Sequence, residues 1–386
     1  MRRRIRVNTS KILTNCKKSP PIYNFLYFIT YILDENVFIG YHYKNVFIRG
    51  NFMNKWINRI YENYPKRFSF PILTYPILKI LGYNVAQMLT DSEIHYLCLM
   101  KIMEKFDVYG VATAMDLSVE AEEFGCSIDF EEEEVPKVKK PLISSLEDIK
   151  YIKVSEVGRK RTKIVLETLE RVLKENPRIP VFGSMIGPFS LSIRLYDINE
   201  IMVNLIEEPE KVHELLEKTF EFLLSYGKEM KRLGAKGVLI AEPAAGLLSP
   251  KFCDEFSSSY IKRITDNLQD EHFIVILHNC GNTQKLVDSM VSTGSKILHF
   301  GNAVDLKKDI IGKVPENIIV MGNLDPVNVF MKGEVKEIYN KTINLLEELK
   351  DYKNFVISSG CDIPYRTPLE NIEAFFSAVK DYNEKL

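Results

Sequence analysis

Short apolar runs alternate with longer amphipathic segments from about residue 68 to the end of the chain. Each run is only a few residues long and is bounded by polar or turn-forming residues, a pattern typical of buried strands. Eight such runs predict eight strands, at 70–74, 108–114, 180–185, 237–241, 273–277, 296–300, 317–321 and 354–358.

The segments between the runs carry apolar residues at helical spacing. In 209–232 these are Val212, Leu215, Leu216, Phe220, Leu223 and Leu224, and 336–349 shows the same periodicity. Strands that alternate with helices predict parallel strands joined by helical crossovers. Eight such units predict an α/β fold of the (β/α)8 TIM barrel type. The structural alternative is a doubly wound open sheet, but the G-x-G-x-x-G motif of its nucleotide-binding members is absent from the sequence.

Composition narrows the functional classes. The net charge of -1 gives no electrostatic attraction to nucleic acid or to an anionic membrane. No apolar run approaches the roughly 18 residues that a membrane span needs. Six cysteines are few and widely spaced for 386 residues, so they do not suggest a secreted disulfide framework. We therefore expect a cytoplasmic protein without a membrane span.

Residues 1–52 differ from the rest of the chain. They begin with Met1-Arg2-Arg3-Arg4 and include an aromatic stretch at 23–31 that is interrupted by polar residues. We expect an N-terminal helical extension, a segment without fixed structure, or an artefact of an assigned start upstream of Met53. An interfacial membrane anchor is a less favoured alternative. Residues 53–386 are expected to form the barrel.

Polar and metal-binding residue types follow the predicted strands. Active-site groups of such barrels come from the carboxyl ends of several strands, which meet on one face. His278 and Cys280 stand at i and i+2, so they leave their strand on the same side. Cys361 follows the eighth run. These three residues are candidate ligands of a catalytic zinc ion, whose fourth position stays open for a substrate.

Each candidate also has a simpler structural interpretation. Buried cysteine behaves as a small apolar residue, which is our interpretation of Cys98, Cys126 and Cys253. His299 lies inside the sixth run and is interpreted as a packed barrel histidine rather than a ligand. Glu120 is interpreted as a surface charge that could instead point toward the site.

Five further polar residues follow the predicted strands. Asp116, Glu242 and Asp325 are candidate catalytic residues, and Asn302 and Asn323 are candidate cofactor-binding residues. Glu242 and Asp325 could each be a labile fourth metal ligand, a base, or an acceptor for neighbouring backbone N–H groups.

Several motifs together resemble one known group. These are the H-x-C pattern of His278 and Cys280 with the later Cys361, the segment LSVEAEEFGC at 117–126, and GNLDP at 322–326. With them, residues 53–386 resemble the uroporphyrinogen decarboxylase superfamily, and within it the methylcobamide:coenzyme M methyltransferases and related corrinoid-dependent methyltransferases. The resemblance implies a (β/α)8 barrel in which the H-x-C…C residues hold zinc.

The resemblance also implies a reaction. The expected enzyme moves a methyl group from a methylated corrinoid, such as methylcobamide or methylcobalamin, to a small thiol such as coenzyme M. The acceptor stays open, with homocysteine or another nucleophile as alternatives. The expected partner is a separate corrinoid protein. The sequence has no complete D-x-H-x-x-G corrinoid motif, because Ile276 stands where the aspartate belongs in front of His278.

The decarboxylases of the same superfamily are the main alternative. They are expected to bind substrate carboxylates with N-terminal arginines, whereas residues 70–83 contain no arginine. They also carry a histidine where this chain has Cys361. Asp116, however, matches their central aspartate, which hydrogen-bonds pyrrole nitrogens. A barrel that binds a corrinoid or tetrapyrrole without catalysis is the third alternative.

Overall fold

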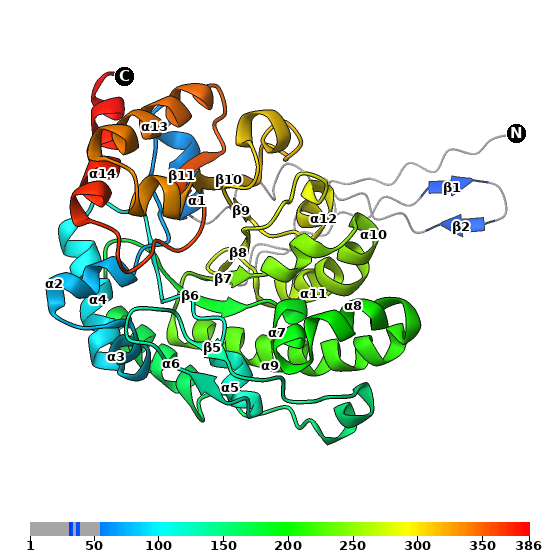
Figure 1. Cartoon of the computed structure of the whole chain (residues 1–386). Helices are drawn as coiled ribbons and strands as arrows, with labels where there is room; N and C mark the ends of the chain where they lie inside the picture. Colours follow the sequence, from blue (N-terminus) through cyan, green and yellow to red (C-terminus); the bar gives the residue numbers. More distant parts are fainter. Residues whose placement is uncertain (1–30, 34–35, 39–54) are drawn as a thin grey trace, which may run out of the picture. The chain divides into compact units, whose positions relative to one another are not determined.

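Seven parallel strands form the central sheet of the protein (Figure 1). The computed structural model describes residues 31–33, 36–38 and 55–386. The strand order is β11-β10-β9-β8-β7-β6-β3, so each strand from β7 onward lies beside the strand that precedes it along the chain. Their bounds are β3 Val111–Ala112, β6 Val181–Ile186, β7 Gly237–Ala241, β8 Ile274–Asn279, β9 Ile297–Phe300, β10 Ile319–Leu324 and β11 Phe355–Ser359.

An eighth extended segment at 68–70 closes this sheet into a barrel. On one side the N–H of Phe70 donates to the carbonyl of Ile357 in β11, at 2.9 Å. On the other side the N–H of Tyr109, just before β3, donates to the carbonyl of Ser69, also at 2.9 Å. The segment is thus hydrogen-bonded to both edges of the sheet, which confirms the predicted (β/α)8 architecture.

Helices cover the outside of the barrel. The longest is α9, Pro209–Leu233, which begins with proline and ends at Gly234 in the left-handed conformation that favours glycine (φ 101°). The others are α1 Lys55–Glu62, α2 Leu78–Leu81, α3 Val85–Thr90, α4 Ser92–Lys105, α5 Val119–Phe124, α6 Arg161–Lys174, α7 Pro188–Leu195, α8 Ile198–Glu207, α10 Pro250–Cys253, α11 Ser259–Leu268, α12 Val287–Ser292, α13 Val335–Glu348 and α14 Leu369–Glu384.

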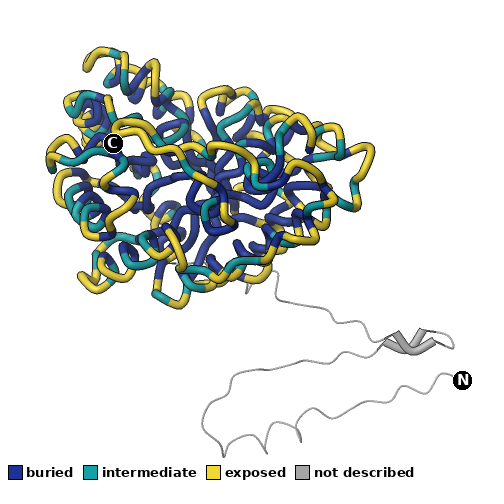
Figure 2. Tube along the Cα trace, turned by 60° about the horizontal axis from the view of Figure 1, so that its bottom comes forward, coloured by how far each residue is buried: buried dark blue, intermediate teal, exposed yellow. Residues whose placement is uncertain are grey.

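Two apolar layers hold the barrel together. The larger layer lies between helices and strands, and the smaller one fills the barrel interior. Trp56 of α1 belongs to the interior layer and stacks on Tyr109, with ring centroids 4.7 Å apart. The two residues also exchange hydrogen bonds with each other's carbonyl oxygens. Figure 2 shows buried segments running through the centre and exposed segments on the outside.

The N-terminal prediction falls largely outside the described residues. The six described residues before position 55 form two short antiparallel strands, β1 Tyr31–Leu33 and β2 Asn36–Phe38, so they do not support a helical extension. The chain divides into two compact units, residues 1–52 and residues 53–386. Among the described helices, none is long and apolar enough to cross a membrane.

The acidic segment near residue 130 is exposed to solvent. It is the turn of a small antiparallel hairpin between β4 Ile128–Asp129 and β5 Lys137–Val138. All four glutamates at 131–134 are exposed to solvent.

Candidate functional site

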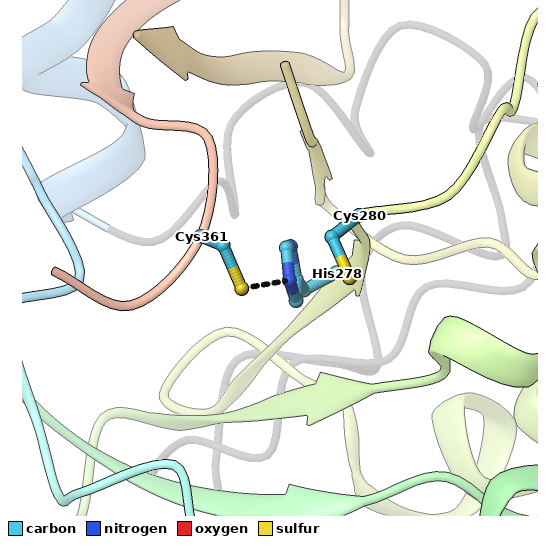
Figure 3. Close-up of side chains that lie close together, drawn as sticks. All are labelled: His278, Cys280 and Cys361. Atoms are coloured by element: carbon cyan, nitrogen blue, oxygen red, sulfur yellow. Dashed lines mark hydrogen bonds between the residues drawn. The ribbon is translucent and has the colours of Figure 1, made fainter. Parts of the chain in front are cut away.

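Three metal-binding side chains meet at the carboxyl ends of β8 and β11. His278 is the penultimate residue of β8, Cys280 follows that strand, and Cys361 follows β11. One donor atom from each of the three residues lies within 4.8 Å of the other two. Figure 3 shows the three side chains lying close together, with the Cys361 sulfur directed at the His278 ring. The structure therefore brings together the three predicted ligands.

The donor set fits a zinc ion. Zinc binds thiolate sulfur at about 2.3 Å and imidazole nitrogen at about 2.0–2.1 Å, so neighbouring tetrahedral donors should lie about 3.6 Å apart. The distance from Cys361 Sγ to His278 Nε2 is 3.6 Å. Two soft sulfur donors with one imidazole favour zinc over magnesium or calcium, which prefer oxygen ligands. Three protein ligands leave a coordination position for a substrate.

The two thiols influence each other's ionisation. Hydrogen bonding with Cys361 lowers the pKa of Cys280 below that of an ordinary cysteine. The same interaction, with burial, raises the pKa of Cys361. The pair alone therefore favours one thiolate over two, because two neighbouring negative charges repel each other. A divalent cation removes this penalty by neutralising both charges.

Next to the candidate ligands lies His299, which is interpreted from sequence as a packed barrel histidine. His299 is fully buried in β9, where its backbone is the direct partner of His278 in β8. His299 Nδ1 lies 2.6 Å from His278 Nδ1, and His299 Nε2 lies 3.0 Å from Ser358 Oγ. Burial lowers the pKa of His299 well below its usual value, which favours a neutral ring. His299 and Ser358 are thus neighbours of the site that sequence reasoning missed.

Glu242 is buried and holds backbone N–H groups. It follows β7, and its carboxylate accepts from the N–H groups of Phe189 (3.1 Å) and Ser190 (2.6 Å) in the first turn of α7. Burial raises the pKa of Glu242 to about 7. Of the three roles expected from sequence, this geometry matches the backbone acceptor, and Glu242 is outside the cluster of three metal ligands.

Asp325, Asn302 and Asn323 form hydrogen bonds that hold the loops at the carboxyl end of the barrel. Asp325 accepts from the N–H groups of Val327 and Asn328, both at 2.8 Å, and from the Asn302 amide at 2.9 Å. The Asn323 amide donates to the carbonyl oxygens of residues 301 and 304. These contacts position the loops after β9 and β10, and the predicted catalytic and cofactor-binding roles remain predictions.

Asp116 is engaged in a buried ion pair. Its carboxylate bonds to the Arg161 guanidinium and accepts from the Ser118 N–H (2.9 Å) and hydroxyl (2.6 Å). The Arg161 guanidinium also donates to Ser118 Oγ (2.8 Å) and to Glu122 (2.6 Å). Both carboxylate oxygens of Asp116 therefore have partners within the protein.

Glu120 is buried rather than on the surface, which corrects its preferred interpretation from sequence. Its Oε1 accepts from the Ile186 N–H at 3.1 Å, while Oε2 has no hydrogen-bond partner among the described residues. Burial raises the pKa of Glu120 from 4.5 to about 8. The carboxyl is therefore mostly protonated in the folded protein at neutral pH. Its deprotonation costs more free energy in the folded protein than in the unfolded chain.

A pH prediction follows for Glu120. Because its folded pKa is raised, its contribution to stability is complete below pH 4.5 and is lost as the pH rises to about 8. Relative to wild type, we expect Glu120→Gln to gain about 1.4 kcal/mol of unfolding free energy per pH unit within this window. Urea unfolding of both proteins at several pH values measures this. The control Glu104→Gln alters a carboxylate whose side chain is 70% exposed and should show no such trend. If the unfolding free energies of Glu120→Gln and wild type changed equally with pH, the prediction would be contradicted.

The remaining described cysteines are not part of the cluster. Cys98, Cys126 and Cys253 are buried and free, and lie away from the three metal-binding donors. This placement agrees with their interpretation as packing residues.

Comparison with known proteins links the chain to one family. The model of the uroporphyrinogen decarboxylase (URO-D) family matches residues 73–382. The chain is 30% identical to the methylcobamide:CoM methyltransferase MtbA of Methanosarcina acetivorans over 277 residues, which cover 70% of this chain and 79% of that protein. It is 28% identical to the uroporphyrinogen decarboxylase of Prochlorococcus marinus, over 74% of this chain and 83% of that protein.

A solved structure shares the fold. A methyltransferase from Methanosarcina mazei superposes with a TM-score of 0.76 at 22% identity, covering 85% of this chain and 99% of the other. At this identity the likeness establishes the barrel architecture.

Proposed function

This chain belongs to the uroporphyrinogen decarboxylase family, and from that premise we propose that it is a zinc-dependent, corrinoid-dependent methyltransferase. The proposed reaction moves a methyl group from a methylated corrinoid to a small thiol. The observation that carries the proposal is the convergence of His278, Cys280 and Cys361 within 4.8 Å at the catalytic end of the barrel. The likeness to methylcobamide:CoM methyltransferases supports the same reaction class.

The residues of the site suit activation of a thiol. His278, Cys280 and Cys361 would hold zinc, which lowers the pKa of a coordinated thiol so that the nucleophilic thiolate prevails at neutral pH. Two thiolates and one neutral imidazole balance the charge of a zinc ion. A centre balanced in this way would leave the sulfur of a bound substrate electron-rich and therefore nucleophilic.

The reaction balances without an external oxidant or reductant. The thiol loses its proton, its sulfur forms a bond to the methyl carbon, and the cobalt–carbon bond breaks. Both electrons of that bond remain on cobalt, so methyl-Co(III) becomes Co(I). The products are a methyl thioether, the Co(I) corrinoid and a proton.

Two features favour this reaction over porphyrinogen decarboxylation. Residues 70–83, where the decarboxylases carry carboxylate-binding arginines, contain none. The carboxylate of Asp116, which would have to face pyrrole nitrogens, is instead paired with Arg161 and Ser118. We further propose that a separate corrinoid protein delivers the methyl group at the barrel mouth, within the cytoplasm.

A direct assay tests the proposal. Zinc-loaded protein is incubated without oxygen with methylcobalamin and, in turn, coenzyme M, homocysteine and 2-mercaptoethanol. We expect the absorption of cob(I)alamin to appear while mass spectrometry detects the methyl thioether of at least one thiol. Cys126→Ala, a buried cysteine outside the cluster, is the control and should retain activity.

Two outcomes would overturn the proposal. Loss of carboxylates from uroporphyrinogen, with no methyl transfer to any thiol, would assign the chain to the decarboxylases. Tight binding of a corrinoid without turnover would indicate a binding module instead of an enzyme.

A further inference from the structure

We propose that His299 is a positioning residue for the metal centre, the middle member of a hydrogen-bonded relay that fixes which nitrogen of His278 faces the metal. The relay runs from His278 through His299 and Ser358 to the carbonyl of Phe70. It rests on the zinc site of the proposed function but is independent of methyl transfer.

The direction of the relay follows from the single proton of Ser358. The Ser358 hydroxyl lies 2.7 Å from the Phe70 carbonyl oxygen, which can only accept. Ser358 therefore donates to Phe70 and has only lone pairs left for His299. The hydrogen bond of 3.0 Å between His299 Nε2 and Ser358 Oγ must then be donated by His299. A neutral imidazole with its proton on Nε2 has a bare Nδ1, which accepts.

The next link determines the tautomer of His278. His278 Nδ1 lies 2.6 Å from His299 Nδ1, so with His299 accepting, His278 must donate from Nδ1. Its Nε2 is then left with a free lone pair. This is the nitrogen that lies 3.6 Å from the Cys361 sulfur, in the ligand cluster. The relay thus presents the lone pair of His278 to the metal without any change of tautomer.

The register of the barrel explains why these residues meet. His278 and His299 are direct partners on the parallel strands β8 and β9, so their side chains project to the same face. Ser358 lies on β11, one strand beyond β10, and Phe70 lies in the segment that closes the barrel. In such barrels, alternate strands contribute side chains to a shared interior layer. The relay therefore depends on closure of the barrel at 68–70.

Burial makes the relay specific. His278, His299 and Ser358 are each at most 1% exposed, so water cannot replace a missing partner. A histidine that ligates a metal commonly donates its second ring N–H to an acceptor that fixes its tautomer and orientation. Here a neutral histidine is that acceptor, and removing such a partner lowers metal affinity by roughly 10- to 100-fold in other proteins.

Zinc affinity in competition with a chromogenic chelator tests the relay. We expect His299→Leu, which keeps the side-chain bulk but offers no acceptor, to bind zinc about 10- to 100-fold more weakly than wild type. His299→Asn should recover much of the loss, because its Oδ1 can accept in place of Nδ1. The control His95→Gln changes another buried histidine, keeps the acceptor for the Ala114 N–H, and should leave zinc affinity unchanged. A leucine variant equal to wild type, or an asparagine variant no tighter than leucine, would overturn the assignment.

A second measurement needs no variant and no metal. Nitrogen-15 NMR of histidine-labelled, metal-free protein distinguishes protonated from bare ring nitrogens. The relay predicts that His278 is protonated at Nδ1 and that His299 is protonated at Nε2. A His278 proton on Nε2 would overturn the relay. If the protein bound no zinc, the proposed function would fail while this measurement still decided the relay.

Discussion

Replacement of Cys361 by alanine is expected to abolish zinc binding at micromolar concentrations of metal. Cys361 supplies one of only three protein ligands, and its loss leaves one thiolate and one imidazole. The free energy of zinc binding by complete four-ligand sites is about 10–16 kcal/mol, so an equal share per ligand is about 2.5–4 kcal/mol. Such a loss weakens binding by roughly 60- to 700-fold. Cys280→Ala should have a comparable effect.

Metal analysis of purified protein measures this expectation. Wild type should carry about one zinc per chain, as expected of a single three-ligand site. The Cys361→Ala and Cys280→Ala proteins should carry almost none, while Cys126→Ala should match wild type. Methyl transfer should disappear together with the metal. Full zinc occupancy in either ligand variant would contradict the proposed site.

Asp116→Ala is expected to destabilise the fold strongly. The Asp116 side chain is fully buried and that of Arg161 is only 7% exposed. Without the aspartate, the positive charge of Arg161 keeps an ion pair only with Glu122. The Glu122 side chain is 22% exposed, so this pair lies partly in contact with solvent. Breaking a buried pair by removing one partner costs about 3–5 kcal/mol. We therefore expect urea unfolding to show a loss of this size.

An exposed ion pair is the matched control. Lys262 and Asp266 lie 2.9 Å apart on α11 with side chains 52% and 57% exposed. Exposed pairs of this kind contribute about 0.3–0.5 kcal/mol, so Asp266→Ala should change stability by no more than this. If Asp116→Ala left stability intact but abolished activity, Asp116 would act in catalysis and not as a structural partner of Arg161.

The barrel could be predicted from sequence because buried parallel strands are short, apolar and regularly separated by amphipathic helices. The run at 237–241 and strand β7 coincide, and the helix predicted at 209–232 differs from α9 by one residue. The first two runs differ more from the structure. The first run, 70–74, contains no strand residue, because the bridge lies at Ser69 just before it, and the second run contributes only the two residues of β3. Apolarity predicts burial there, but hydrogen bonding to both neighbours decides the length of a strand.

The candidate site also has a part that could be predicted from sequence and a part that could not. The i and i+2 spacing of His278 and Cys280, with Cys361 on a second strand end, was sufficient to predict that the three side chains meet. The role of His299 could not be predicted, because a histidine in an apolar run has the same local sequence whether it packs or donates. Only the register that pairs it with His278 reveals the contact.

The roles of the acidic residues at strand ends could not be predicted from sequence either. Spacing places Glu242 and Asp325 at strand ends, but a carboxylate there can face either the substrate or the backbone. In the structure Glu242 accepts from N–H groups at the start of α7, which follows β6, and Asp325 accepts from N–H groups of the turn that follows β10. The choice depends on where the neighbouring helix or turn places its N–H groups, which strand periodicity does not contain.

The central claim is that a thiol substrate binds at the metal held by His278, Cys280 and Cys361. X-ray absorption at the zinc edge, with and without an accepted thiol, tests this most directly. We expect two sulfur ligands and at least one nitrogen ligand in the protein alone, and a third sulfur ligand after the thiol is added. Absence of zinc sulfur coordination, or a sulfur count that the thiol does not change, would contradict the claim.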